Sequence, residues 1–191
     1  MKQEMIGSVP GNVLGMLADL MHKLQHGVRT TDQLDRFLKG QNPFAVLFTM
    51  VVDYASARWQ SINKTLYAYV DNSLTVEDFP TSGTGAAEVT YEYVEFDHEP
   101  TTQEALDEIE RDPRGLRRPD RAEAETFIER NPGEYKERPL IALCGSVADR
   151  DGGRDVASVY AGAGGVDLYW PWIDDRWGRP CRFLAVRRVA L

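Results

Sequence analysis

Residues 140–173 read LIALCGSVADRDGGRDVASVYAGAGGVDLYWPWI, a series of short apolar runs separated by glycine-rich turns. The runs at 140–147 and 166–173 have the composition of buried strands. Asp151-Gly152-Gly153 is a hairpin signal that leads into a partner strand at 156–160, and residues 182–189 supply a fourth strand. The pattern predicts a closely linked set of antiparallel strands.

The residues before this region add one strand and two helices. Residues 89–96 alternate between two faces, as a strand does. Thr101 or Thr102 then caps a helix that ends at Asp112-Pro113, and a shorter helix over 121–130 stops at Asn131-Pro132-Gly133. The predicted order from residue 88 onward is strand, helix, helix, strands.

The first 75 residues look helical. Residues 12–25 carry apolar side chains at helical spacing between Asn12, a capping residue, and Gly27, and a second short helix is predicted over 31–39. Residues 44–69 are predicted to form one helix or two, because Trp59, Ile62, Leu66 and Tyr69 match a helical stripe.

The predicted fold class is therefore α+β. A helical segment (1–75) and a small, flexible, polar linker (76–87) precede a domain over 88–191 that carries an antiparallel sheet.

Composition restricts the partners. The chain has 191 residues, of which 42% are hydrophobic and 27% charged, and its net charge is −8. An acidic chain does not attract nucleic acid through bulk electrostatics. The longest apolar run, 44–52, is far shorter than the ~20 residues that a spanning helix needs. The N-terminal residues lack a signal-peptide pattern, so we expect a cytoplasmic location with neither membrane nor nucleic acid as partner.

The histidines do not indicate a metal site. His22 and His26 stand at i, i+4 on the first predicted helix, but there is no HExxH motif and no acid in position to be a third ligand. His98 lies between Asp97 and Glu99 in a predicted surface turn. We expect neither a metal nor another cofactor.

The cysteines and glycine-rich runs give little support to catalysis. Cys144 lies in an apolar run and is expected to be an inert buried thiol. Cys181 lies next to Arg182, which favours some activation, but no histidine is near it in sequence. The runs SGTGAA and GAGG lack the GK[ST] of a P-loop. No catalytic residue is assigned, and the chain is predicted not to be an enzyme.

Residues 165–182, GVDLYWPWIDDRWGRPCR, hold three of the four tryptophans together with three arginines and three aspartates. Tryptophan, tyrosine and arginine dominate binding hot spots because they combine a large contact area with a polar group. In a strand, Trp170 and Trp172 would share one face and residues 167, 169, 171 and 173 the other. One face would then be scaffold and the other a display surface.

The C-terminal region resembles the variable proteins of diversity-generating retroelements, which adopt a C-type-lectin-like fold. The resemblance rests on four segments: Glu110-Arg-Asp-Pro113, LIALCGSVADRDGG, VASVYAGAGGVDLYW and FLAVRRV. It covers roughly the last 100 residues, and its motifs are loose. The calcium-binding signatures of animal lectins are absent, which agrees with the expectation of no metal.

The resemblance implies a display surface without catalysis. Its ligand-binding positions would be Asp167, Tyr169, Pro171, Ile173, Asp174, Asp175, Arg176, Gly178, Arg179 and Cys181. Trp170, Trp172, Trp177 and the FLAVRRV strand would be framework. The expected partner is a protein or another macromolecule, and homo-oligomer formation stays open.

Two other function classes remain. The first is a structural or assembly protein that uses the β domain as an interface. The second is a small enzyme with a cleft thiol or acid, for which Cys144, Cys181 and His98 are the candidates.

Overall fold

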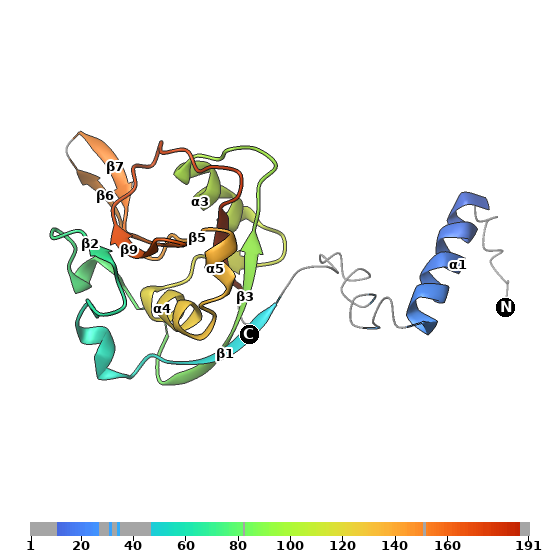
Figure 1. The fold of residues 1–191 in the computed structure, drawn as a ribbon, viewed down its shortest axis with the longest axis horizontal. Coiled ribbons are helices and arrows are strands. Elements are labelled where there is room, and N and C mark those ends of the chain that lie inside the picture. Colours follow the sequence, from blue (N-terminus) through green and yellow to red (C-terminus); the bar gives the residue numbers. More distant parts are fainter. Residues whose placement is uncertain are drawn as a thin grey trace, which may run out of the picture. The chain divides into compact units, whose positions relative to one another are not determined.

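The computed structural model describes residues 11–26, 31, 34, 47–81, 83–150 and 152–187 (Figure 1). The chain divides into two units, Met1–Ala45 and Val46–Leu191. In the first unit, α1 occupies Gly11–Gln25 and so begins one residue before the expected cap, Asn12. The helix predicted over 31–39 falls mostly outside the described residues. None of the helices within the described part has the length and apolarity that a membrane crossing requires.

The second unit is a mixed α and β fold with a mostly antiparallel sheet, as predicted. Its strands are β1 (Phe48–Asp53), β2 (Tyr69–Val70), β3 (Ala86–Val94), β4 (Leu116–Arg117), β5 (Leu140–Ala142), β6 (Val147–Arg150), β7 (Gly153–Val156), β8 (Ser158–Gly162), β9 (Gly165–Tyr169) and β10 (Arg182–Arg187). Its helices are α3 (Thr102–Arg111), α4 (Arg121–Arg130) and α5 (Glu134–Glu137), with 3-10 turns η1 (Ala57–Gln60) and η2 (Val76–Asp78).

The main sheet has the order β1-β3-β10-β5-β8-β9-β2, with β4 also paired to β10. Two of its pairings are parallel, β10 with β5 and β2 with β9. The predicted hairpin at Asp151-Gly152-Gly153 exists, but it joins β6 to β7 in a separate two-stranded sheet, while β5 pairs with β8. Residues 140–147 therefore do not form a single strand.

The helix predicted over 44–69 is wrong. This region forms β1, η1, an irregular stretch and β2, and both strands belong to the main sheet. The structure therefore replaces the expected boundary at 76–87 with one between Ala45 and Val46, and the 76–87 interval lies inside the second unit.

Reciprocal capping boxes start α3 and α4. Thr101 accepts a hydrogen bond from the Glu104 amide, and the Glu104 carboxylate accepts one from the Thr101 amide, a reciprocal capping box that starts α3. Asp120 and Glu123 do the same for α4. Because each box satisfies backbone donors that helix ends leave free, both helix starts are well defined.

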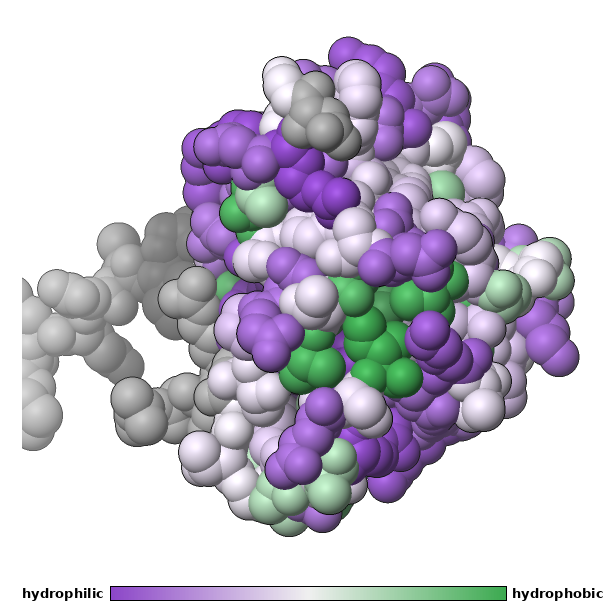
Figure 2. Space-filling model, turned by 90° about the vertical axis from the view of Figure 1, so that its left-hand side faces the viewer, coloured by the Kyte–Doolittle hydropathy of each residue, from purple (hydrophilic) through white to green (hydrophobic). Residues whose placement is uncertain are grey.

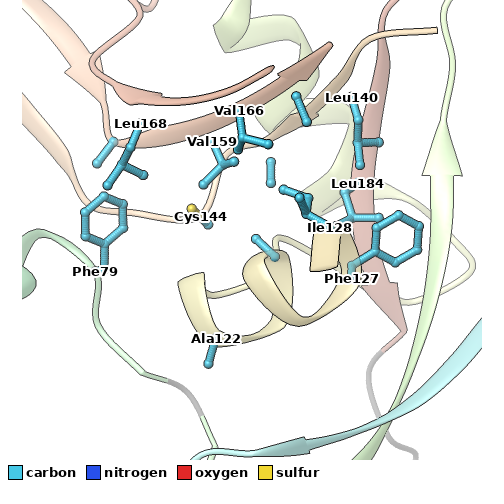
Figure 3. Packing of buried hydrophobic residues seen from close by; sticks show 14 of the residues in the cluster. Phe79, Ala122, Phe127, Ile128, Leu140, Cys144, Val159, Val166, Leu168 and Leu184 are labelled. Carbon is cyan, nitrogen blue, oxygen red and sulfur yellow. The ribbon is translucent and has the colours of Figure 1, made fainter. Parts of the chain in front are cut away.

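The sheet is covered on both faces. On one face, Ala124, Phe127 and Ile128 of α4 pack against strand residues such as Leu140 and Leu184 (Figure 3). On the other face, α3 packs through Ala105, Leu106 and Ile109 against a cluster that includes Ile141 and Phe183. Alternate residues of β5 and β10 thus enter opposite cores, as the strand period of two requires.

Candidate functional site

A row of polar side chains crosses β8, β9 and β2 on the α3 side of the sheet. Tyr160 of β8 pairs with Asp167 of β9, and Asp167 pairs with Tyr69 of β2. The neighbours of Asp167 in β9, Val166 and Leu168, enter the α4-side core. Cross-strand partners point to the same face, so a carboxylate lies between two tyrosines in this row. We call Tyr160, Asp167 and Tyr69 the tyrosine–aspartate row.

The row is accessible to solvent. The side of the molecule that carries β2 is seen in Figure 2, where a small apolar patch is surrounded by polar residues. Tyr69 is 55% exposed, and Tyr160 and Asp167 are half-buried. Tyr169, two residues beyond Asp167 in β9, is also half-buried and packs beside the α3-side core.

Residues 170–181 return along the same side of the sheet and are held by backbone hydrogen bonds. The Ile173 amide donates to Arg154 O at 2.7 Å, and the Trp177 amide donates to Pro100 O at 2.9 Å. The Trp177 ring is stacked on Tyr160, with 6.4 Å between ring centroids, and its Nε1 donates to Thr102 Oγ1 at 3.0 Å. Trp177 is therefore framework, as expected.

The structure brings some predicted display positions to the surface and removes others. Asp167, Tyr169 and Cys181 are half-buried, and five positions in the returning segment are exposed: Asp174, Asp175, Arg176, Gly178 and Arg179. Pro171 and Ile173 are buried, so they are not displayed as predicted. The cause is that residues 171–173 bond to β7 and Ile173 packs into the α3-side core, so the side of this segment that was expected to be displayed is covered.

The two tryptophans of this segment also differ in exposure from what was predicted. Trp172 is 59% exposed, so its predicted framework role is wrong. Trp170 is half-buried against the α4-side core, with the Arg150 guanidinium 4.7 Å from its ring centroid. Of the two residues, only Trp170 packs against a core as the predicted framework role requires.

Sequence reasoning missed Tyr69 and Tyr160. Tyr160 could have been found, since it alternates with Val159 and Ala161, which point into the core. Tyr69 was assigned to a helix, and only its pairing with β9 brings it beside Asp167.

The side chain of Asp167 makes no hydrogen bond or ion pair with another described residue. Some buried carboxylates of this protein are compensated by arginine. Glu92, 1% exposed, binds both Arg114 and Arg187, and Asp112 also binds Arg114. Asp167 differs from these acids, because it is half-buried and has no cation partner among the described residues.

Two carboxylates of α4 show the same compensation. Glu123 is fully buried and accepts hydrogen bonds from two Arg117 nitrogens at 2.5 and 2.7 Å and from the Tyr54 hydroxyl. Glu125 accepts one from the Tyr67 hydroxyl at 2.6 Å, with Arg121 at 3.7 Å. Burial raises the pKa of the Glu125 carboxyl, which Tyr67 and Arg121 oppose.

The charges around the two half-buried tyrosines are negative. Burial is the main cause of a raised pKa of Tyr169, and Asp175 and Asp167 raise it further. Burial also raises the pKa of Tyr160, again with Asp167 as a contributor. The cations of the returning segment interact elsewhere. Arg176 donates to Glu99 O at 2.9 Å. The hydrogen bond with His98 is the main cause of a lowered pKa of the Asp97 carboxyl, to which Arg179 also contributes.

The groups considered for catalysis are poorly suited to it. Burial raises the pKa of the Cys144 thiol to about 12, and burial also raises the pKa of Cys181. His98 is exposed and contacts Asp97 at 2.9 Å. A hollow of about 360 Å³ lies beside Cys144, but its Arg117 is bound to Glu123. Nothing in this geometry joins a nucleophile to a base.

Metal ligation finds no support within the described residues, where no three His, Cys, Asp or Glu side chains converge. His22 and His26 are exposed and lie ring to ring at 4.2 Å. Both cysteines are free thiols.

Comparison with protein-family models, with curated proteins and with solved structures finds no match to this chain.

Asp167→Asn is expected to leave the free energy of unfolding unchanged or slightly higher, since it removes a half-buried charge that has no partner among the residues that the structure describes. Urea denaturation followed by circular dichroism measures this. A fall of more than about 1 kcal/mol would mean that the carboxylate has a structural role after all.

The two cysteines should react more slowly with thiol reagents than typical surface thiols do. In the folded protein at about pH 8, Ellman's reagent is expected to titrate Cys181 slowly and Cys144 not at all, because the thiolate is the reactive form and burial disfavours it. Both should react after unfolding in urea. A Cys181→Ser variant identifies the responding residue, and rapid native reaction of Cys144 would contradict its assignment as inert.

Proposed function

We propose that residues 46–187 form a non-catalytic binding module whose ligand-contacting surface is the tyrosine–aspartate row with Tyr169 and the exposed residues of segment 174–181. The observation that carries this proposal is the position of Asp167 between two tyrosines on an accessible face, with no ion pair to any residue in the described part of the chain. Tyrosines offer a large, rigid contact area with a polar end, which suits a recognition surface. The ligand is a protein or another macromolecule.

We further propose that the module is C-type-lectin-like and that its surface is diversified by a retroelement. Two features support the first part. The order from β3 to β10 is strand, two helices and strands, and β3 pairs with β10, so that the two ends of this region lie side by side (Figure 1). For the second part, the accessible predicted positions are concentrated between Asp167 and Cys181, where exchange would leave both cores in place.

Substitution tolerance tests the display surface. A library randomised at Asp167, Tyr169, Asp174, Asp175 and Arg176 should yield a protease-resistant protein in most clones. An equally large library at buried Ile141, Leu168, Phe183, Leu184 and Ala185 should yield it rarely. Equal failure of the two libraries would reject a display surface.

The diversification is tested on the DNA. Sequencing the locus in the source population should reveal a template repeat, a reverse transcriptase and adenine-linked variation confined to the codons for residues 167–182. An invariant segment without a nearby repeat would reject diversification and leave the binding module standing.

An assembly protein would use the same exposed aromatic residues, Tyr69 and Trp172, against a second copy. Light scattering of the wild type and of Tyr69→Arg separates the two functions. A dimer that dissociates on substitution would favour assembly, and a monomer in both cases favours binding of a different partner.

A further inference from the structure

We propose that the tyrosine–aspartate row binds the guanidinium group of an arginine side chain on a partner protein, with Asp167 as the anion and Tyr69 and Tyr160 as the flanking rings. This inference rests on the proposed binding function and names the chemistry of its ligand.

Charge complementarity is the first argument. Asp167 has no cation among the described residues, whereas Glu92 has two arginines and Glu123 has one in a bidentate contact. Arginine is thus the cation that this protein itself places beside Glu92 and Glu123. A partner's cation would complete the same arrangement across an interface, as charge-assisted pairs do.

The neighbourhood of the row adds to the negative charge. Besides burial, Asp175 and Asp167 both raise the pKa of Tyr169, and Asp167 contributes to the raised pKa of Tyr160. Arg176 is bonded to a backbone carbonyl, and Arg179 interacts with Asp97. An incoming cation would therefore meet carboxylates and ring faces.

The flanking rings favour guanidinium over ammonium. Arg182 already lies 4.0 Å from the Tyr93 ring centroid in this protein, and Arg58 lies 4.0 Å from that of Trp59. A planar guanidinium can stack on a tyrosine while its fork donates to a carboxylate, whereas an ammonium is a point charge that retains its water more strongly. A row of tyrosine, aspartate and tyrosine offers both contacts at adjacent positions.

The test titrates the full chain with four short peptides of equal length: oligoarginine, oligocitrulline, oligolysine and oligoglutamate. Citrulline keeps the size and planarity of arginine without its charge. Two-dimensional NMR of the labelled protein reports where each peptide binds. Oligoarginine is expected to shift the amide signals of Tyr69, Tyr160 and Asp167, oligolysine to bind more weakly, and the other two peptides not to bind at this row.

Variants separate a specific site from general attraction to an acidic protein. Asp167→Asn should weaken oligoarginine binding by about tenfold. Tyr69→Leu should also weaken it, and Tyr69→Phe, which keeps the ring, should not. The matched control is Glu88→Gln, an exposed acid on β3 near the opposite end of the sheet, which should have no effect. Raising the salt concentration should weaken binding.

Three results would overturn the inference: a dissociation constant weaker than about 1 mM for oligoarginine, equal binding of oligocitrulline, or equal effects of Asp167→Asn and Glu88→Gln. None of them removes the binding function itself, whose library test does not depend on a cationic ligand. Binding of oligocitrulline or oligoglutamate at this row would keep the surface as a binding site and reject arginine as its ligand.

Discussion

Glu123→Gln is expected to lower the free energy of unfolding by about 3–5 kcal/mol, the largest effect of any single change considered for this protein. The carboxylate is fully buried and receives hydrogen bonds from Arg117, from the Tyr54 hydroxyl and from the Asp120 amide. Glutamine has one carbonyl oxygen in place of two charged ones, and its amide would point a donor at other donors. Arg117 would then lack its counter-ion.

Glu129→Gln is the matched control, because it makes the same substitution on the same helix. Glu129 is partly exposed and contacts Arg58 at 2.8 Å, so this change should cost less than about 1 kcal/mol. Urea denaturation of both variants, with equal m-values, gives the comparison. Similar losses would show that burial of Glu123 does not set its contribution.

Gly145→Ala is expected to be the second-largest effect, a loss of about 3 kcal/mol. A Cβ at this buried position would lie 2.4 Å from the Ala157 Cβ and 2.8 Å from Asp78 O. Both neighbours are constrained, since the Gly145 amide donates to Ala157 O and the Ser146 amide donates to Asp78 O. The backbone of two segments would have to separate to admit one methyl group.

Gly164→Ala tests the same substitution where there is space, since no atom lies within 4 Å of the added Cβ. Its effect should stay within about 0.5 kcal/mol. Thermal unfolding of the two variants distinguishes crowding from the general cost of losing a glycine. A loss at Gly145 no larger than that at Gly164 would contradict the close contact with Ala157.

Local signals predicted the parts of the fold that depend on local chemistry. Thr101 was one of two predicted caps and does start α3, and the helix predicted over 121–130 is α4, because capping and helical spacing are contacts over a few residues. The glycine-separated strands were found for a similar reason. β1 was missed although Thr49, Val51 and Val52 are strand-favouring, because the apolar residues beyond it have helical spacing. That stripe begins with Trp59 in η1 and ends with Tyr69 in β2.

The candidate site was predicted only in part, because strand alternation separates two faces but does not say which face the rest of the protein covers. It placed Asp167 and Tyr169 on one face, but Pro171 and Ile173 are buried and Trp172 is exposed. The tyrosines that flank Asp167 come from β8 and β2, and β2 lies almost 100 residues earlier in the chain. Such a row depends on strand order and register, which no short motif encodes.

The position of β10 has a consequence for folding kinetics. This strand lies between β3 and β5, and its Arg187 binds Glu92 from 95 residues away. The β1–β3 part of the sheet is connected to the β5–β8–β9–β2 part only through β10. We therefore expect the rate-limiting step of folding to close a long loop before the contacts of β10 contribute stability. Folding should therefore be slow for a chain of this size, and changes in the length of segment 170–181 should alter the folding rate more than the equilibrium.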